Sequence, residues 1–187
     1  MNINILQVIL IFIVTFVAAI DQFSFLESLY QPIVTGPIVG WILGDAHTGL
    51  IVGASYQLMT IGNMPVGGAQ PPNAVVGGIV AVIFAITSGL EPNAAVAAAI
   101  PFALLGQYGV TLIFTLMAPV MSKADQYAKE ANPKGIEKIN YLSMIALGTI
   151  FGLIVVFFFI AGSTFGTELT SKIPETFMHG LSVAGGM

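Results

Sequence analysis

The chain has 187 residues, of which 56% are hydrophobic and only 7% are charged, and its mean hydropathy is +0.94. A soluble domain carries roughly 25% charged residues, so this chain has too few charges to cover a water-soluble particle. The same numbers exclude intrinsic disorder, which needs low hydrophobicity and high net charge. The composition therefore predicts an integral membrane protein.

Residue types that are missing narrow the function further. All of the basic residues are lysines, and the net charge is −4. The absence of arginine argues against nucleic acids and phosphate-rich ligands, for which the bidentate guanidinium is preferred. The absence of cysteine excludes disulfides, thiolate chemistry and cysteine metal sites. The two histidines, His47 and His179, are too few for a metal site without carboxylates, so we expect neither a metal nor a cofactor.

Motifs of catalysis are absent from the sequence. It contains no dinucleotide-binding, phosphate-loop or zinc-protease motif, and neither histidine lies in a nucleophile-elbow context. Asp45 and His47 flank a predicted turn and are interpreted as marking an interface, and Glu91 as an interfacial cap. Without a paired intramembrane carboxylate, proton-driven symport has no carrier group. We expect no catalytic residue; a facilitator, a channel or a permease energised by other proteins remains.

The chain begins with an apolar segment, and residues 1–20 are predicted to form an N-terminal membrane helix. The first ten residues carry no Lys, and no clear cleavage motif follows, so this segment is expected to stay in the mature chain. Residues 21–31 form a polar and aromatic interlude that includes Glu27.

Residues 33–90 have an unusual pattern. The apolar segments 33–43, 49–61 and 74–87 are too short for ordinary membrane spans, and Gly- and Pro-rich tips separate them. No Asp, Glu, Lys or Arg occurs from residue 46 to residue 90, which a water-exposed loop would be expected to carry. The pattern predicts broken or re-entrant helical hairpins, whose non-helical tips must be buried in protein or line a wet cavity. The alternative is a pair of ordinary helices joined by an uncharged external loop.

The second half of the chain divides into four predicted segments. Residues 94–120 are long enough to cross the membrane but are predicted to be broken by Pro101 and Gly106. Residues 122–140 hold four of the five lysines, and the positive-inside rule makes them a cytoplasmic loop. Residues 141–161 form the clearest transmembrane helix, and 171–187 begin a further, incomplete C-terminal segment.

Neutral polar side chains surround the Gly/Pro tips. Burying such groups without partners costs about 1 to 3 kcal/mol each, so they must bond to one another, to freed backbone groups or to a ligand. Amides together with the rings of Trp41 or Tyr56 suit a neutral polyhydroxylated solute; the alternative is that they only tie the broken helices together. In transporters, interrupted hydrophobic segments point to the substrate site. The predicted substrate-binding residues are Gln57, Asn63, Gln70 and Asn73, with Gln107 second to them, and Gly67 and Gly68 allow close backbone approach.

Several motifs together resemble a known family. They are GDAHTGLIVG (44–53), GGAQPPN (67–73), IPFALLGQY (100–108), the KAD and AKEA forms within 123–131, and HG with VAGG in 179–186. The chain is similar over its whole length to the enzyme IIC subunit of the mannose/fructose/sorbose family of sugar phosphotransferase systems. The GGAQPPN and KAD…AKEA forms look most like the N-acetylgalactosamine/galactosamine branch.

The resemblance implies an all-α, multi-pass protein of the bacterial inner membrane, with an elevator-type core built from re-entrant hairpins. It implies a permease rather than an enzyme, working as an oligomer of IIC–IID units with the membrane enzyme IID. Phosphate would pass through enzyme I and HPr to the cytoplasmic enzymes IIA and IIB, and IIB would phosphorylate the incoming hexose or amino sugar. The phosphohistidines belong to those partners, so His47 and His179 need not be catalytic.

The chain departs from the family pattern in two respects. Family members usually continue for several dozen residues beyond the Ala-Gly-Gly motif, so this chain is expected to be a fragment or a C-terminally shortened product, and a naturally short form would be inactive. Some mannose-type members carry acidic residues at Gln57 and Asn73, so the neutral residues suggest a different sugar or a site tuned without charge. Two other functions stay open: a small homo-oligomeric channel or holin-like pore, and a structural or receptor role.

Overall fold

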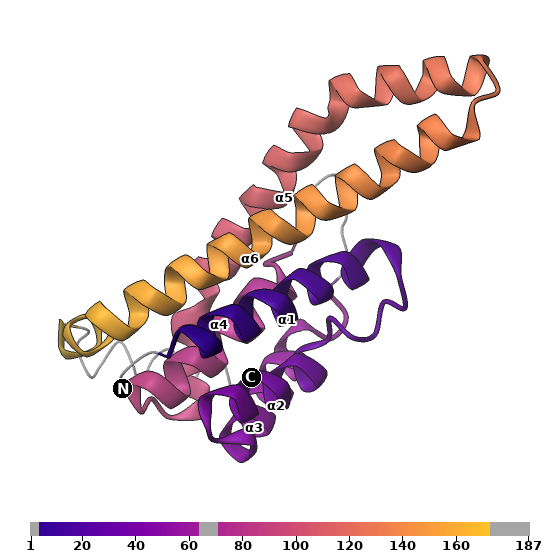
Figure 1. Cartoon of the computed structure of the whole chain (residues 1–187). Coiled ribbons are helices and arrows are strands. Elements are labelled where there is room, and N and C mark those ends of the chain that lie inside the picture. Colours follow the sequence, from indigo (N-terminus) through magenta and orange to yellow (C-terminus); the bar gives the residue numbers. More distant parts are fainter. Residues whose placement is uncertain (1–3, 64–70, 173–187) are drawn as a thin grey trace.

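A computed structural model of the protein describes residues 4–63 and 71–172, with side chains up to residue 161. Every regular element in these ranges is an α-helix, which confirms the all-helical expectation for the part that is described. The helices are α1 (Ile5–Ser24), α2 (Pro32–Leu43), α3 (Ala46–Thr60), α4 (Ala74–Ser88), α5 (Pro92–Lys129) and α6 (Pro133–Lys172). Figure 1 shows a bundle from which the far ends of α5 and α6 project together.

Three of the described helices are long and apolar enough to cross a membrane: Ile5–Ser24, Pro92–Lys129 and the Pro133–Ala161 part of α6. By contrast, α2 has 12 residues, and α3 and α4 have 15 each. At 1.5 Å per residue these three helices are about 18 to 23 Å long, shorter than the hydrocarbon layer of about 30 Å. The short apolar segments predicted from the sequence thus correspond to separate helices.

Glycines bring α2 and α3 into close antiparallel contact. Gly36 and Gly40 lie one turn apart on α2, and Gly49 and Gly53 lie one turn apart on α3. A Cβ added at Gly40 would lie 2.8 Å from the Cα of Gly49, and one at Gly49 would lie 2.8 Å from the Cα of Gly40. Small residues at this spacing allow two membrane helices to approach backbone to backbone. The turn between the helices uses Gly44 at a φ of 97°.

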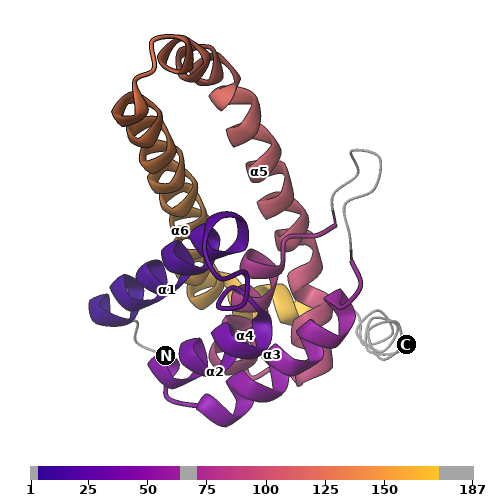
Figure 2. The same ribbon diagram turned by 90° about the vertical axis from the view of Figure 1, so that its right-hand side faces the viewer.

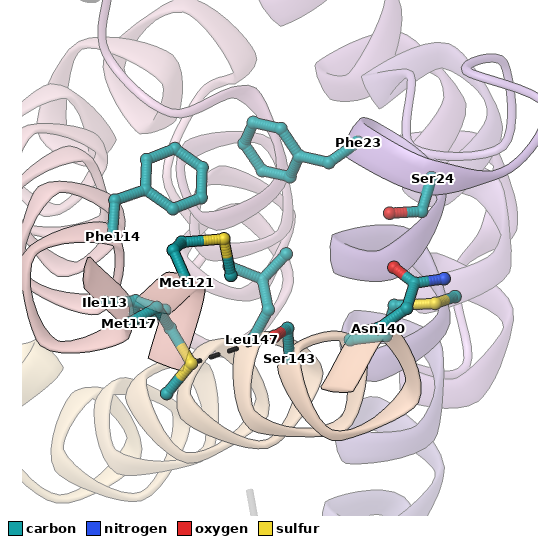
Figure 3. Close-up of a pocket in the computed structure, with 10 residues that line it drawn as sticks. Phe23, Ser24, Ile113, Phe114, Met117, Met121, Asn140, Ser143 and Leu147 are labelled. Atoms are coloured by element: carbon teal, nitrogen blue, oxygen red, sulfur yellow. Dashed lines mark hydrogen bonds between the residues drawn. The ribbon is translucent and has the colours of Figure 1, made fainter. Parts of the chain in front are cut away.

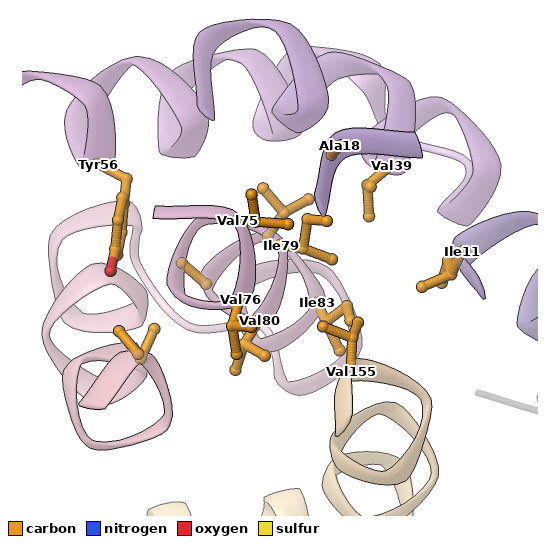
Figure 4. Close-up of a cluster of buried hydrophobic side chains, with 14 of the residues drawn as sticks. Ile11, Ala18, Val39, Tyr56, Val75, Val76, Ile79, Val80, Ile83 and Val155 are labelled. Carbon is orange, nitrogen blue, oxygen red and sulfur yellow. The ribbon is translucent and has the colours of Figure 1, made fainter. Parts of the chain in front are cut away.

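Helix α4 lies at the centre of the molecule. Its residues from Val75 to Ile83 are all buried, and α1, α2, α3, α5 and α6 all pack against it. Figure 4 shows Val75, Val76, Ile79, Val80 and Ile83 surrounded by side chains from α1, α2, α3 and α6. A helix that is apolar on every face is stable only when protein or lipid covers it all round. The bundle therefore forms around α4.

Two predicted boundaries are wrong because α5 and α6 are longer than expected. The charged stretch 122–140 is not a loop: α5 runs to Lys129 and α6 starts at Pro133, so only residues 130–132 connect them. Lys, Glu, Gln and Ala are strong helix formers, so polarity alone did not distinguish a solvated helix from a loop. Asn132 ends the turn, where its side chain accepts a hydrogen bond from the Gly135 N–H. Figure 2 shows the two helices separating before they meet at this turn.

The segment predicted as broken at 94–120 is part of one continuous helix. Helix α5 accommodates Pro101 and Pro119 in its interior, and it bends toward α6 in its second half (Figure 1). Gly106 is buried against Val76 and Asn73, so it serves close packing with α4 rather than a break. The predicted C-terminal segment overlaps the end of α6 as far as Lys172, and residues 173–187 lie outside the described part.

Candidate functional site

A polar pocket of about 500 Å³ lies where α1, α3, α4 and α5 converge. Its wall comes from the end of α1 and the connection to α2, the end of α3, the start of α4 and the middle of α5. The described lining residues are Gln22, Phe23, Glu27, Tyr30, Gln31, Gln57, Thr60, Ile61, Gly62, Asn63, Pro71, Pro72, Asn73, Ala74, Gln107 and Val110. Ligand pockets in proteins span roughly 300 to 1,000 Å³, so the volume suits a small molecule.

Two glutamines from different helices meet in this wall. The Gln57 Nε2 donates a hydrogen bond to the Gln31 Oε1 at 2.6 Å. The Gln57 Oε1 is buried and has no hydrogen-bond partner among the described residues. Buried polar atoms are rarely left without a partner, so this oxygen is an unused hydrogen-bond acceptor in the described part of the wall.

Asn73 makes more structural hydrogen bonds than the sequence indicated. Only 3% of the residue is exposed. Its Oδ1 accepts from the Val76 N–H at 2.9 Å and so caps α4, and its Nδ2 donates to the Gln22 Oε1 at 3.1 Å. Its backbone N–H donates to the Ala103 carbonyl on α5 at 3.0 Å. Asn73 therefore shapes the pocket through these three hydrogen bonds.

The other predicted residues divide between the pocket and the part of the chain outside the description. Asn63 lines the pocket just after α3, next to Gly62 with its φ of 84°, and Gln107 lines it from α5. Gln70, Gly67 and Gly68 lie outside the described residues. Of the seven predicted residues, the structure thus brings Gln57, Asn63, Asn73 and Gln107 together, and it does not describe the remaining three.

The aromatic residues expected beside the sugar lie elsewhere. Trp41 is 75% exposed and is not among the lining residues. Tyr56 is fully buried (Figure 4), and the hydroxyl end of its ring lies against Gly77. The rings in the pocket wall belong to Phe23 and Tyr30 instead. The direction of a side chain on a short helix depends on which helices pack around it, and the sequence alone does not show this packing.

Sequence reasoning missed the connection between α1 and α2 as a part of the site. Gln22, Glu27, Tyr30 and Gln31 all line the pocket. The available signal was the concentration of polar and aromatic residues in 21–31, directly before the first short helix. The sequence indicates only an interlude between membrane segments, because nothing local shows that it folds back toward Gln57, Asn63 and Asn73.

A second pocket of about 370 Å³ lies between the end of α1 and the facing sides of α5 and α6. Figure 3 shows Phe23, Phe114, Met117, Met121 and Leu147 in its wall, with the Ser143 hydroxyl 3.7 Å from the Met117 sulfur. Among the described residues, the other polar ones in its wall are Ser24 and Asn140. This mostly apolar wall offers few partners for a polyhydroxylated ligand, so the first pocket is the candidate site.

Comparisons with known proteins agree on one family. The family model described as "PTS system sorbose-specific IIC component" matches residues 5–187. The putative N-acetylgalactosamine permease IIC component 2 of Escherichia coli K12 is 45% identical over 125 residues, which cover 67% of this chain and 94% of that protein. N-acetylgalactosamine permease IIC component 1 of the same organism is 31% identical over 186 residues, covering 100% of this chain and 70% of that protein.

The fold is also similar to solved structures. A chain in the cryo-EM structure of the mannose transporter ManYZ in complex with microcin E492 superposes with a TM-score of 0.81 at 29% identity. A second chain, described only as a membrane protein, superposes with a TM-score of 0.88 at 30% identity. In both comparisons all of this chain and 76% of the other chain are covered.

Proposed function

Because the chain belongs to the family of sorbose-specific IIC components of the phosphotransferase system, we propose that its polar pocket binds a hexose or an amino sugar on the way across the membrane. Family membership makes the chain a IIC permease component, the transport subunit of a sugar phosphotransferase system. It also makes the chain a multi-pass protein of the bacterial inner membrane. The observation that carries the proposal for the pocket is the buried Gln57 Oε1, an acceptor with no partner among the described residues.

The chemistry of the wall fits a sugar. Gln57, Gln107 and Asn63 supply donors and acceptors in a neutral form, and each sugar hydroxyl can both donate and accept. The rings of Phe23 and Tyr30 offer apolar faces for the CH groups of a pyranose. Gln70, with Gly67 and Gly68, would complete the binding set from the segment before Pro71. Pro71 and Pro72 would stiffen this segment and so reduce the entropy lost when the sugar is ordered.

The sugar that we propose is N-acetylgalactosamine or galactosamine. The support is the similarity to the two N-acetylgalactosamine permease IIC components, one of which is 45% identical over the matched residues. Mannose, fructose and sorbose are the other candidates, since relatives named for these sugars match at 30 to 31% identity.

The partners that we propose are the membrane enzyme IID and the cytoplasmic enzymes IIA and IIB, with IIB phosphorylating the sugar. The fold likeness to a chain of ManYZ supports a IIC–IID unit. Helices α2, α3 and α4, each too short to span, support re-entrant hairpins in a core that moves as an elevator. The four lysines near the α5–α6 turn support a cytoplasmic position for residues 122–140.

The test is phosphoenolpyruvate-dependent uptake of labelled sugars. The chain is expressed with IID, IIA and IIB in cells that lack mannose-family permeases, and the panel is N-acetylgalactosamine, galactosamine, mannose, fructose and sorbose. We expect one or both galactosamine sugars to accumulate in phosphorylated form. Omission of IIB is the control, because it removes the phosphoryl donor and leaves the membrane subunits unchanged.

The outcomes separate the parts of the proposal. Accumulation of a different phosphorylated sugar would overturn the substrate and keep the permease function. Uptake that appears only after the chain is extended at its C-terminus would show that these residues need a further segment. Ion leakage in place of uptake would support a pore, and it would contradict the proposed sugar pocket.

A further inference from the structure

A buried carboxylate organises the connection between α1 and α2. Asp21 lies in the last turn of α1 and is 0% exposed. Its Oδ1 accepts a hydrogen bond from the Leu26 N–H at 2.8 Å, and its Oδ2 accepts one from the Tyr30 N–H at 2.9 Å. Hydrogen bonds to a charged carboxylate are strong. These two bonds fix the backbone at Leu26 and at Tyr30, on either side of residues 27–29. Asp21 therefore determines the path of residues 26–30.

Glu27 lies between these two anchoring points in a costly conformation. Its φ is 54°, in the left-handed region that residues other than Gly rarely adopt. Such a conformation costs about 1 to 3 kcal/mol and persists only where the surrounding structure imposes it. Backbone strain of this kind concentrates at functional sites. The two Asp21 hydrogen bonds are the constraint that holds Glu27 in this conformation.

The strained residue is also the charged residue of the pocket. Among the described lining residues Glu27 is the only acidic one, and none is basic. The other polar groups in the wall are neutral: the amides of Gln22, Gln31, Gln57, Asn63, Asn73 and Gln107, the Thr60 hydroxyl and the Tyr30 phenol. A single carboxylate in such a wall distinguishes ligands by charge, which the amides do not.

We propose that Glu27 is a specificity-determining residue for sugars that carry a protonated amine, and that Asp21 is the positioning residue that holds it in the pocket. This inference rests on the proposed function of the pocket in sugar binding. A protonated amine donates a charge-assisted hydrogen bond to a carboxylate, which is roughly twice as strong as a bond between neutral groups. An N-acetylated sugar carries a neutral amide at the same carbon, so it gains no charge-assisted hydrogen bond to the carboxylate. The pocket should therefore favour a free hexosamine over its N-acetyl derivative.

The experiment compares two sugars that differ only at the amine. Galactosamine and N-acetylgalactosamine are the probes, measured by uptake with IID, IIA and IIB and by equilibrium binding to the purified IIC–IID complex in nanodiscs. Glu27→Gln keeps the size of the side chain and removes its charge. We expect it to weaken galactosamine binding about tenfold relative to N-acetylgalactosamine, the difference between a charge-assisted and a neutral hydrogen bond. Glu27→Asp, which keeps the charge, should restore part of the preference.

The Asp21 variant tests positioning. Asp21→Asn replaces one accepting oxygen by an NH₂ group that faces a backbone N–H, so the 26–30 segment loosens and the backbone at Glu27 is no longer held in place. We expect the ratio of the two KM values to move in the same direction as in Glu27→Gln. The matched control is Asp45→Asn, the same change at the N-cap of α3, where Asp45 accepts from the Thr48 N–H at 2.9 Å. Asn also caps helices well, and this variant should leave the ratio unchanged.

The outcomes distinguish this inference from the function on which it rests. A wild-type chain that transports and binds neither sugar overturns both. Wild-type transport with the same ratio in Glu27→Gln overturns the role of Glu27 and keeps the pocket as a sugar site. If Asp21→Asn lowers transport of both sugars equally, Asp21 is only structural. A ratio shifted by Glu27→Gln and Asp21→Asn but not by Asp45→Asn supports the proposal.

Discussion

The Gln57 and Gln31 side chains, 26 positions apart in the sequence, are joined by a 2.6 Å hydrogen bond that links α3 to the residue before α2. This bond uses one N–H of the Gln57 amide, and the buried oxygen of the same amide has no hydrogen-bond partner among the described residues. The pair thus holds the end of α3 against the connection from α1.

Gln57→Ala should reduce sugar uptake by about tenfold or more while the protein still inserts into the membrane, because it removes both the acceptor and the link to Gln31. The measurement is uptake normalised to the amount of permease in isolated membranes. Ser55→Ala is the matched control on the same helix, since within the described part of the chain the Ser55 hydroxyl bonds to the Ile51 carbonyl one turn earlier. Normal uptake in Gln57→Ala would contradict a direct role for this amide.

Asn73→Ala should lower thermal stability as well as uptake. It removes the cap of α4, which is worth about 1 kcal/mol, and it also removes the bond to Gln22. Asn73→Ser keeps a side-chain oxygen that can cap α4 and loses the donor to Gln22 without burying a charge, so we expect a smaller loss of stability. Melting temperatures of the detergent-solubilised variants provide the comparison. Equal losses in the two variants would mean that the cap contributes little.

Tyr56→Phe should leave uptake unchanged and should not lower stability. The Tyr56 hydroxyl is buried and has no hydrogen-bond partner among the described residues, so its removal relieves a desolvation cost of about 1 to 3 kcal/mol. Gly77→Ala should be strongly destabilising, because a Cβ there would collide with the Tyr56 ring. A large loss of stability in Tyr56→Phe would show that the hydroxyl has a partner after all.

Gly77→Ala combined with Tyr56→Phe gives a second check on this contact. The added Cβ would overlap the hydroxyl oxygen most closely, so the double variant should recover part of the stability that Gly77→Ala loses. Strict additivity of the two changes in melting temperature would contradict the predicted collision.

Glu27→Gly should raise thermal stability by about 1 kcal/mol, since Gly adopts a φ of 54° without strain. The same change removes the carboxylate, so the preference for galactosamine over N-acetylgalactosamine should disappear. A melting curve and the ratio of the two uptake rates test both parts. Higher stability together with lost selectivity is expected if the strained backbone at Glu27 is kept for its function. Lower stability in Glu27→Gly would contradict the strain argument.

Glu130→Cys tests the orientation of the α5–α6 turn. The sequence has no native cysteine, so a single thiol at this exposed position reports one location. We expect a membrane-impermeant maleimide to label it in inverted vesicles and not in intact cells. Labelling of intact cells would place residues 122–140 on the outer side and contradict the positive-inside argument.

Much of the helical pattern followed from the sequence. The short apolar segments 33–43, 49–61 and 74–87 correspond to α2, α3 and α4 within a few residues, because Gly and Pro interrupt helices through local backbone restrictions. Length and polarity were weaker guides for α5 and α6. Charged residues with a high helix propensity can extend a membrane helix into water. The prediction of a loop at 122–140 was therefore wrong.

For the site, the sequence by itself determined which kinds of groups stand beside the Gly- and Pro-rich breaks: uncharged amides. Only the tertiary structure decided which of them meet. It placed Gln57, Asn63, Asn73 and Gln107 around one pocket, and it turned Asn73 largely to capping α4. It also brought in Glu27 and Gln31 from a polar and aromatic connection whose position beside the pocket the local sequence does not specify. The reason is physical: composition and spacing act along the chain, whereas the pocket depends on how α4 is buried and on the Asp21 hydrogen bonds that fold residues 26–30 toward it.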